Sequence, residues 1–246
     1  MNQVEQITLS WETKLFPDEI RRRFAASSSA LGIPDAEIGW LFHREDGRQQ
    51  MDSSVVRFTG SATKTHLTAI GEKAASLIDT NMRRILAISR QAGLDHPPRI
   101  RLDQCSYARL THSRSYTINR LALGRIKLGP NITDPSQEEL TSRIQSTVAN
   151  SLNSQAETIG LTPLGLEAGG VRVQMISEKT LAKVHERTDG EMSYIPCWRQ
   201  VVIGLPFKLH GEWGAGSLVS RGYGRIKSQA TGAAIAAKQK MRQEHS

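Results

Sequence analysis

The residues best suited to chemistry are concentrated in one glycine-rich segment, residues 213–227, with the sequence WGAGSLVSRGYGRIK. Glycine permits a positive φ and lets backbone amides approach a phosphate group closely. Arginine and lysine add positive charge, and a tyrosine ring offers a stacking surface for a base. The segment therefore predicts contacts with a phosphate-bearing ligand; a tight bend before an edge strand is the structural alternative. The residues concerned are Gly214, Gly216, Arg221, Gly222, Tyr223, Gly224, Arg225 and Lys227.

Positive charge is concentrated in two parts of the chain. The formal net charge of the 246 residues is +8. Residues 99–127 hold seven basic residues against one acidic residue, and residues 219–246 hold six against one. The remainder of the chain is net negative. A near-neutral body with two basic segments favours a polyanion as partner, with a generally basic soluble protein as the alternative.

Several functional classes are excluded by the sequence. No Gly-Lys-Ser/Thr follows the glycines, and their spacing differs from the dinucleotide-binding fingerprint. Cys105 and Cys197 lie far apart and outside any C-x-x-C pair, so neither a zinc site nor a disulfide framework is expected. No apolar run approaches the roughly 18–20 residues that span a bilayer, and the N-terminus lacks the pattern of a secretory signal. We therefore expect a cytoplasmic protein that uses no metal ion and no cofactor.

The spacing of apolar residues predicts the elements of the first part of the chain. Residues 4–11 and 53–59 alternate as strands do, and residues 66–92 have helical spacing that ends before Gly93 and the Pro97-Pro98 pair. A first helix is expected between the two strands. It begins at Pro17, has acidic residues at its positive end and buries an apolar stripe. The acidic residues are Asp18 and Glu19, and the stripe is Ile20, Phe24 and Leu31.

The second part of the chain repeats the mixture of strands and helices. A strand-like region at 99–129 precedes a helix capped by Asp134 with Pro135 at its first position. Strands are expected at 171–176, 199–209 and 217–227, and a tail helix at 229–243. This order predicts an α+β fold with the split β-α-β unit used twice. The expected organisation is an N-terminal ferredoxin-like (RRM-like) half, residues 1–130, with an added helical segment near 62–96, and a C-terminal half, residues 131–246, with the glycine-rich loop and the tail helix.

One motif supports a specific family. Gly214-x-Gly216, followed by five residues and then Gly222-Tyr223-Gly224, resembles the glycine-rich loop of the CRISPR-associated RAMP proteins. Within that superfamily it is similar to the endoribonucleases that process precursor CRISPR RNA. The chain length, the basic balance and the position of the motif near the C-terminus agree with this resemblance. The long helical segments match the type IV branch best.

The resemblance implies a function as well as a fold. It implies two ferredoxin-like halves that bind the stem–loop of a repeat RNA and cut it at the base of the stem. It implies a reaction without a metal ion, in which the ribose 2′-OH attacks the adjacent phosphate in line and leaves a 2′,3′-cyclic phosphate and a 5′-OH. It also implies that the enzyme keeps its crRNA product inside a complex with other CRISPR subunits.

This chemistry requires a base, positive charge on the phosphorane and an acid for the leaving oxygen. Histidine is the usual acid or base near neutral pH. His43, between the first helix and the second strand, is the first choice, because catalytic groups of the family often come from this region. His210, shortly before the glycine-rich segment, is the second choice. The chain lacks a clear histidine–tyrosine–lysine set, so arginine is considered as another route.

Arginines of the first helix offer that route. At about 100° per residue, Arg22 points to solvent, whereas Arg21 and Arg23 lie at the two borders of the face that contains Ile20 and Phe24. A border arginine is held along the protein surface and can be aimed at a phosphate. Arg23 is the favoured catalytic candidate, and Arg21 and Arg22 are expected to bind RNA. A solvated run of charge is the alternative.

Two other helices carry candidate cations. In the expected tail helix, Arg242 falls on almost the same stripe as Ile235 and is a third catalytic candidate, with Lys238 at the border; a disordered basic tail is the alternative. The helix predicted at 66–92 is expected to grip the stem–loop through its phosphates, with a core helix and a solvated face as the alternative. Its cations are Lys64, Lys73, Arg83, Arg84 and Arg90.

Two rival functions remain compatible with the sequence. One is a binding module of the same superfamily that caps an RNA without cutting it. The other is a DNA-binding or ribosome-associated basic protein, although no helix-turn-helix signature has the required spacing.

Overall fold

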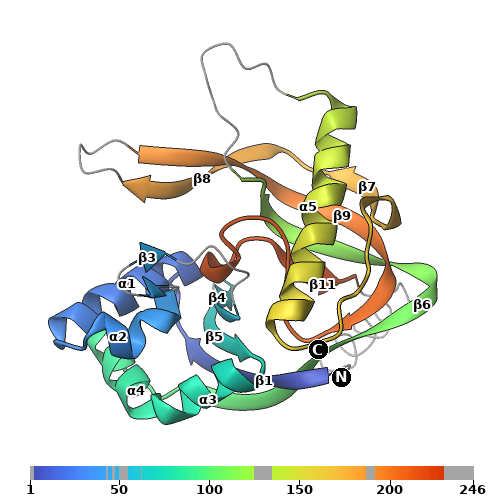
Figure 1. Cartoon of the computed structure of the whole chain (residues 1–246). Coiled ribbons are helices and arrows are strands. Elements are labelled where there is room, and N and C mark those ends of the chain that lie inside the picture. Colours follow the sequence, from blue (N-terminus) through green and yellow to red (C-terminus); the bar gives the residue numbers. More distant parts are fainter. Residues whose placement is uncertain are drawn as a thin grey trace, which may run out of the picture.

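The computed structural model describes residues 3–42, 44–45, 48–49, 55–61, 63–124, 135–186 and 192–229 (Figure 1). The helices are α1 (Pro17–Ala30), α2 (Asp35–Ile38), α3 (Glu72–Thr80), α4 (Met82–Gln91) and α5 (Gln137–Thr158), with 3₁₀ turns η1 (Gly39–Phe42), η2 (Ala168–Gly170) and η3 (Val219–Arg221). The strands are β1 (Gln3–Glu12), β2 (Arg44–Glu45), β3 (Arg48–Gln49), β4 (Val56–Gly60), β5 (Lys64–Ile70), β6 (Arg99–Ala122), β7 (Arg172–Ile176), β8 (Lys179–Glu186), β9 (Met192–His210), β10 (Trp213–Gly214) and β11 (Arg225–Ser228).

The first half of the chain is a ferredoxin-like unit. Its strands lie in the order β6-β1-β5-β4, and every pairing is antiparallel. The chain reaches this order through β1, α1, β4, β5, the α3–α4 pair and β6, which is the split β-α-β arrangement. The helices cover one face of the sheet (Figure 1).

Alternating side chains explain why this sheet has one apolar and one polar face. On β1, Ile7, Leu9 and Trp11 are buried against the helices, whereas Gln6, Thr8 and Ser10 belong to the opposite face. Helix α1 supplies Ile20 and Phe24 to the apolar side. The Phe24 ring meets the rings of Trp11 and Phe58 edge to face, with centroids 5.8 and 5.4 Å apart.

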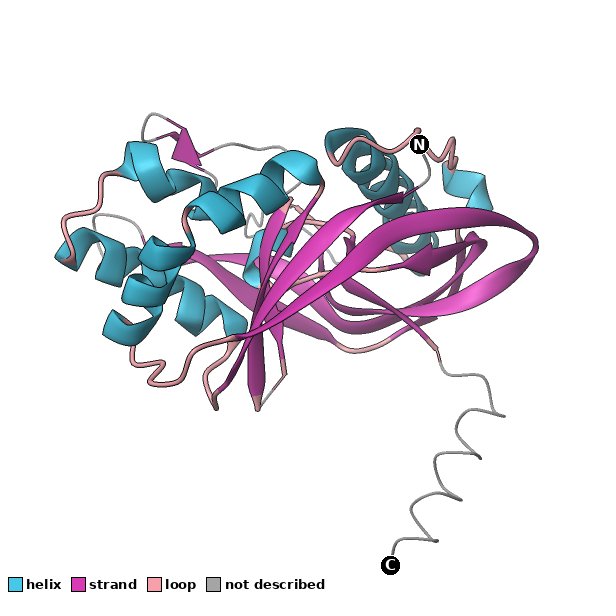
Figure 2. Cartoon of the chain, turned by 90° about the horizontal axis from the view of Figure 1, so that it is seen from below, coloured by secondary structure: helices cyan, strands magenta, loops and turns pink. Residues whose placement is uncertain are grey.

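The second half repeats the same strand order around a second core. Its strands lie in the order β11-β6-β9-β7, and helix α5 packs over them with Leu140, Ile144, Val148 and Leu152. In the described part of the chain, the glycine-rich segment connects β9 to β11 where a ferredoxin-like unit has its second helix. Figure 2 shows the long strands curving between helices α1–α4 on one side and α5 on the other. The prediction of an α+β fold with ferredoxin-like halves is confirmed.

Strand β6 belongs to both halves. Its residues 99–106 pair with β1, and its residues 106–122 pair with β9, so one continuous sheet joins the two cores. Strands β8 and β9 form a hairpin that projects from the sheet (Figure 1). The boundary expected at residue 130 lies in the range 125–134, outside the described residues.

The prediction of one helix over 66–92 is wrong. Residues Lys64–Ile70 are strand β5, and the helical part is divided into α3 and α4 at Asn81. Only 72–91 of the helical segment expected near 62–96 is helical. The cause is that Leu67 and Ile70 lie three residues apart and continue the helical spacing of the residues that follow, although in the strand Leu67 and Ala69 face the helices and Thr68 lies on the polar face.

Smaller corrections concern the ends of elements. Leu31 is 43% exposed and lies outside the stripe of α1. Helix α5 begins at Gln137, two residues later than expected from Pro135, because Ser136 and Glu139 form a reciprocal capping box. Within the strand expected at 217–227, only the residues from Arg225 onward are extended. The expected tail helix and Asp134 lie outside the described residues.

Candidate functional site

The glycine-rich segment folds back on itself at the junction of the two halves. Gly216, Gly222 and Gly224 have φ values of +86°, +84° and +66°, which favour glycine. A Cβ on Gly224 would lie 1.8 Å from the carbonyl oxygen of Ala215, and one on Gly216 would lie 2.5 Å from that of Ala122. The glycines are therefore needed for the close approach of backbone to backbone.

The side chains of this segment contact the protein itself. Arg221 forms a bidentate ion pair with Asp18 at the start of α1, at 2.6 and 3.0 Å. The Tyr223 ring is buried, and the Arg120 guanidinium lies 3.9 Å above its centroid. Sequence reasoning expected both residues to face RNA, whereas here they join the segment to α1 and β6. Gly214 closes the short strand β10, and its N–H donates to Gln155 of α5.

A network of hydrogen bonds and an ion pair around Glu212 positions Arg225. The Glu212 carboxylate forms a bidentate ion pair with the Arg225 guanidinium. The Glu212 backbone N–H donates to Gln6 of β1, and its carbonyl oxygen accepts from Gln155 and from Arg57. Burial lowers the pKa of Arg57 to about 10, and the Glu212 carboxylate opposes that shift. Arg225 is therefore held over the polar face of the first sheet.

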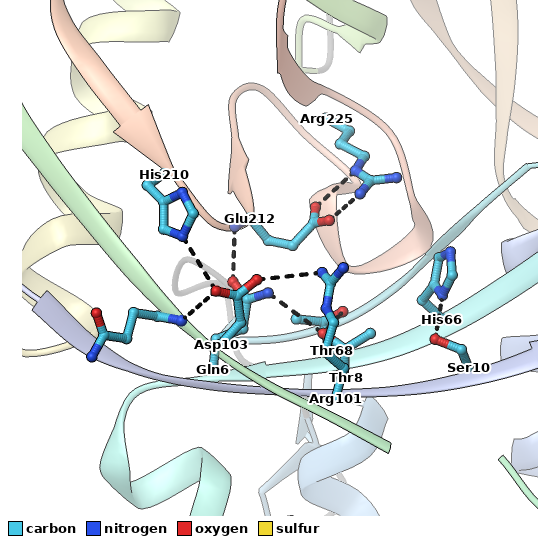
Figure 3. Close-up of polar contacts among 11 residues, drawn as sticks. Gln6, Thr8, Ser10, His66, Thr68, Arg101, Asp103, His210, Glu212 and Arg225 are labelled. Atoms are coloured by element: carbon cyan, nitrogen blue, oxygen red, sulfur yellow. Dashed lines mark hydrogen bonds and ion pairs between the residues drawn. The ribbon is translucent and has the colours of Figure 1, made fainter. Parts of the chain in front are cut away.

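That polar face brings together residues from the three neighbouring strands β1, β5 and β6 (Figure 3). The register places Gln6 beside Asp103, Thr8 beside Arg101 and Thr68, and Ser10 beside Arg99 and His66. Because cross-strand partners share a face, all these side chains lie on the side opposite helices α1–α4. The face presents guanidinium groups, hydroxyls and imidazoles, which suit an anionic, hydrogen-bonding ligand.

Two histidines lie at separate places on this face. His66 Nδ1 and Ser10 Oγ share a hydrogen bond of 2.8 Å. Burial, and then the nearby Arg225, lower the pKa of His66 from its ordinary value of 6.5. His210 Nε2 lies 3.2 Å from Asp103 Oδ1, and a backbone N–H from Gln104 is the main cause that lowers the pKa of Asp103. Sequence reasoning named His210 but missed His66, which the wrong helix at 66–92 had concealed.

The three arginines of α1 all have local partners. Arg21 donates to the carbonyl oxygen of Phe42 at 2.9 Å, and its guanidinium lies 5.8 Å from the Phe42 ring centroid. Arg22 and Arg23 both pair with Glu19, at 2.7 and 3.0 Å. Arg22 and Arg23 are exposed, so both can exchange Glu19 for a ligand.

The other predicted site residues are spread over the molecule or lie outside the described part. Arg83 and Arg84 are exposed on α4, where Arg84 pairs with Glu37 at 2.6 Å. Lys227 is exposed on β11, and its pKa is lowered by partial burial and then by Arg225. The structure brings neither Arg83 nor Arg84 to the glycine-rich segment. His43, Lys238 and Arg242 are outside the described residues.

Two further observations concern metal binding and membrane insertion. The described residues contain no cluster of three or more histidine, cysteine or acidic side chains that could hold a metal ion. None of their helices is long and apolar enough to cross a membrane.

Comparison with solved structures defines the class of protein. A structure described as Cas6b has a TM-score of 0.66 at 14% identity, and one described as "Csf5, CRISPR-Cas type IV Cas6 crRNA endonuclease" has 0.61 at 19% identity. A second Cas6b, described as a CRISPR RNA processing endoribonuclease, has 0.56 at 13%. Each comparison covers 92% of this chain and 100% of the other. The fold of this chain is therefore that of these Cas6 structures.

The family follows from the sequence match. The family model "Type IV CRISPR-associated endonuclease Csf5" matches residues 2–231. The chain belongs to this Csf5 family of type IV CRISPR-associated endonucleases. No curated protein sequence matches the chain significantly.

Proposed function

We propose that this chain is an endoribonuclease that binds the stem–loop of CRISPR repeat RNA and cuts it to give mature crRNA. In the proposed reaction the ribose 2′-OH attacks the adjacent phosphate, the bond to the 5′-oxygen breaks, and a 2′,3′-cyclic phosphate and a 5′-OH remain. The reaction needs no metal ion. The observation that carries the proposal is the match of the Csf5 family model to residues 2–231.

The descriptions of similar structures support an RNA substrate. One is called a crRNA endonuclease and another a CRISPR RNA processing endoribonuclease. The chain shares their fold over 92% of its length. The basic balance of the chain agrees, because contacts from lysine and arginine to phosphates supply most of the nonspecific affinity for nucleic acid.

The proposed catalytic residues are Arg23, His43 and Arg242. Arg23 is exposed on α1 and pairs with Glu19, so a phosphate can replace that carboxylate. Arginine stabilises the doubly charged phosphorane by bidentate hydrogen bonds. Arg21, Arg22, Arg83 and Arg84 and the cations of the glycine-rich segment are proposed to bind the RNA backbone, and Lys227 is the most exposed of the latter.

We further propose that the protein keeps its product within a ribonucleoprotein complex. Guanidinium groups that clamp a phosphate without an ideal acid–base pair give a slow reaction and a tightly held product. Slow turnover is acceptable for a protein that delivers one crRNA to one complex. The partner subunits would then recognise the protein together with its RNA.

The test uses the purified chain and a labelled CRISPR repeat transcript in EDTA. We expect a shortened RNA on a denaturing gel, and a product that comigrates with the protein on a native gel. An intact RNA in a shifted band would indicate a binding subunit that does not cut. Equal competition by duplex DNA would contradict recognition of RNA.

A further inference from the structure

His66 occupies a site that neither the sequence motif nor the proposed arginines explain. It lies on β5 in the polar face, with Ser10 of β1 on one side and Thr59 of β4 on the other. Ser10 Oγ holds Nδ1 at 2.8 Å, and Figure 3 shows the other ring nitrogen on the side away from Ser10. Thr59 is 2% exposed, and its hydroxyl oxygen has no partner among the described residues. We therefore expect a ligand or a solvent molecule to form a hydrogen bond with this buried hydroxyl group.

Lysine and arginine side chains outnumber the acidic side chains around this site. Burial disfavours the charged imidazole most, Arg225, Arg101 and Lys64 add to this effect, and the Glu212 carboxylate opposes it. Arg101 and Lys64 have 65% and 49% exposed side chains, so both can reach a bound ligand. The charged groups on or beside this face are Glu12 on β1, Arg57 on β4, Lys64 on β5, Arg99, Arg101 and Asp103 on β6, His210 on β9, Glu212 before β10, and Arg225 and Lys227 on β11.

We propose that His66 is a catalytic residue that accepts the proton of the attacking ribose 2′-hydroxyl, with Ser10 as its positioning residue. The inference rests on the proposed endoribonuclease activity but places the cut phosphate on the polar face, with Arg225 and Arg101 as its cations. Arg23 lies on α1, which covers the opposite face of the sheet, so Arg23 and His66 are alternative sites and do not act on one phosphate. A neutral imidazole that donates Nδ1–H to Ser10 Oγ has its lone pair on Nε2, where a 2′-OH can be deprotonated. Burial, and then the nearby Arg225, lower the pKa of His66 and so favour the neutral imidazole, which is the form that a base requires.

The steps of the reaction balance without a further reactant. The 2′-OH proton passes to His66 Nε2 as the 2′-oxygen bonds to phosphorus. The bond from phosphorus to the 5′-oxygen then breaks, and the 5′-oxygen takes a proton from water. Arg225, which uses two of its nitrogens on Glu212, and Arg101, which lies 3.5 Å from Asp103, are placed to stabilise the phosphorane charge. His66 finally returns its proton to solvent.

His210 is too far away to be the matching acid. Asp103, its partner, lies opposite Gln6, whereas His66 lies opposite Ser10, four residues further along β1. At about 3.3 Å per residue, the two positions are separated by about 13 Å. An acid and a base acting on one phosphate must each come within about 3 Å of its oxygens. His210 therefore does not act on the same phosphate as His66, and its contact in the described structure is the hydrogen bond with Asp103.

The test compares wild type with His66→Gln, His66→Ala and Ser10→Ala in single-turnover cleavage of the repeat transcript in EDTA. Loss of a general base should slow cleavage by about 100-fold or more, and Ser10→Ala should slow it by a smaller factor. The affinity of each variant for an RNA with a 2′-deoxy nucleotide at the cut position should stay within about threefold of the wild-type affinity, because the base acts only in the reaction. Added imidazole should restore part of the activity of His66→Ala and should not increase the activity of wild type.

The pH dependence gives a second, independent readout. The wild-type rate should fall with acid through a pKa below 6.5, because protonation of His66 removes the base, and this limb should vanish in His66→Gln. His96→Gln, an exposed histidine between α4 and β6, is the matched control and should cleave normally. Normal cleavage by His66→Gln, or a wild-type rate without this limb, would overturn the inference alone. A wild type that never cleaves repeat RNA would overturn the proposed function as well.

Discussion

Individual side chains of the glycine-rich segment stabilise the junction between the two halves. Arg221 and Tyr223 were expected to face RNA because their types suit phosphate and base contacts. In the structure Arg221 joins η3 to α1 through Asp18, and Tyr223 packs beneath Arg120. Residue types alone could not show this, because the partners come from positions far away in the sequence.

Arg221→Ala tests the first of these contacts. The side chains of Arg221 and Asp18 are 13% and 22% exposed, so solvent screens the pair only partly. We expect the free energy of unfolding to fall by about 1–3 kcal/mol in urea denaturation. The control is Arg199→Ala, which removes an ion pair with Glu178 whose side chains are 72% and 64% exposed, and should change stability by at most about 1 kcal/mol. Equal losses in the two variants would contradict a structural role for Arg221.

Arg23→Ala and Arg242→Ala test the proposed phosphate clamp. Both variants should lose cleavage of the repeat transcript by a larger factor than they lose affinity for it, because a clamp on the phosphorane acts mainly in the transition state. Cleavage rates and gel-shift affinities measure the two effects separately. The control is Arg143→Ala, an exposed arginine on α5, which should change neither quantity. A matched fall in rate and affinity would assign Arg23 and Arg242 to binding alone.

Elements that alternate or carry strong end signals were predictable from the sequence. The strand at 4–11, the helix that begins at Pro17 and the strand-like region from 99 are all present in the structure. Strand β5 was mistaken for a helix because Leu67 and Ile70 lie three residues apart and continue the helical spacing of α3, and this error concealed His66. Strand β8 was missed as well. The register that sets Ser10 beside His66 depends on long-range pairing, which no local pattern records.

Gly224→Ala tests whether the glycine-rich segment requires its tight backbone path. Gly224 has a φ of +66°, and a Cβ would meet the carbonyl oxygen of Ala215 at 1.8 Å. Because backbone must move, we expect a loss of more than about 3 kcal/mol in the free energy of unfolding. Gly169→Ala is the matched control, since a Cβ there meets nothing within 4 Å; it should stay within about 1 kcal/mol of wild type. Thermal or urea unfolding measures both, and similar stabilities would show that the segment tolerates a side chain.

The whole molecule combines two ferredoxin-like units through one shared strand. Its α+β class and the use of the same unit twice followed from the order of strands and helices in the sequence. The sharing of β6 did not follow, because a strand of 24 residues with different partners at its two ends looks like any other alternating run. Figure 2 shows the long strands curving between the two groups of helices, and Figure 3 shows Glu212 and Arg225 of the second half beside the polar face of the first.

The most direct test of the proposed reaction is made on the RNA. Two repeat transcripts are compared in EDTA, one fully ribose and one with a single 2′-deoxy nucleotide at the cut position. If the 2′-oxygen is the nucleophile, the protein should bind both transcripts and shorten only the first, leaving a 2′,3′-cyclic phosphate on it. Cleavage of the deoxy-substituted transcript at the same position would contradict the account.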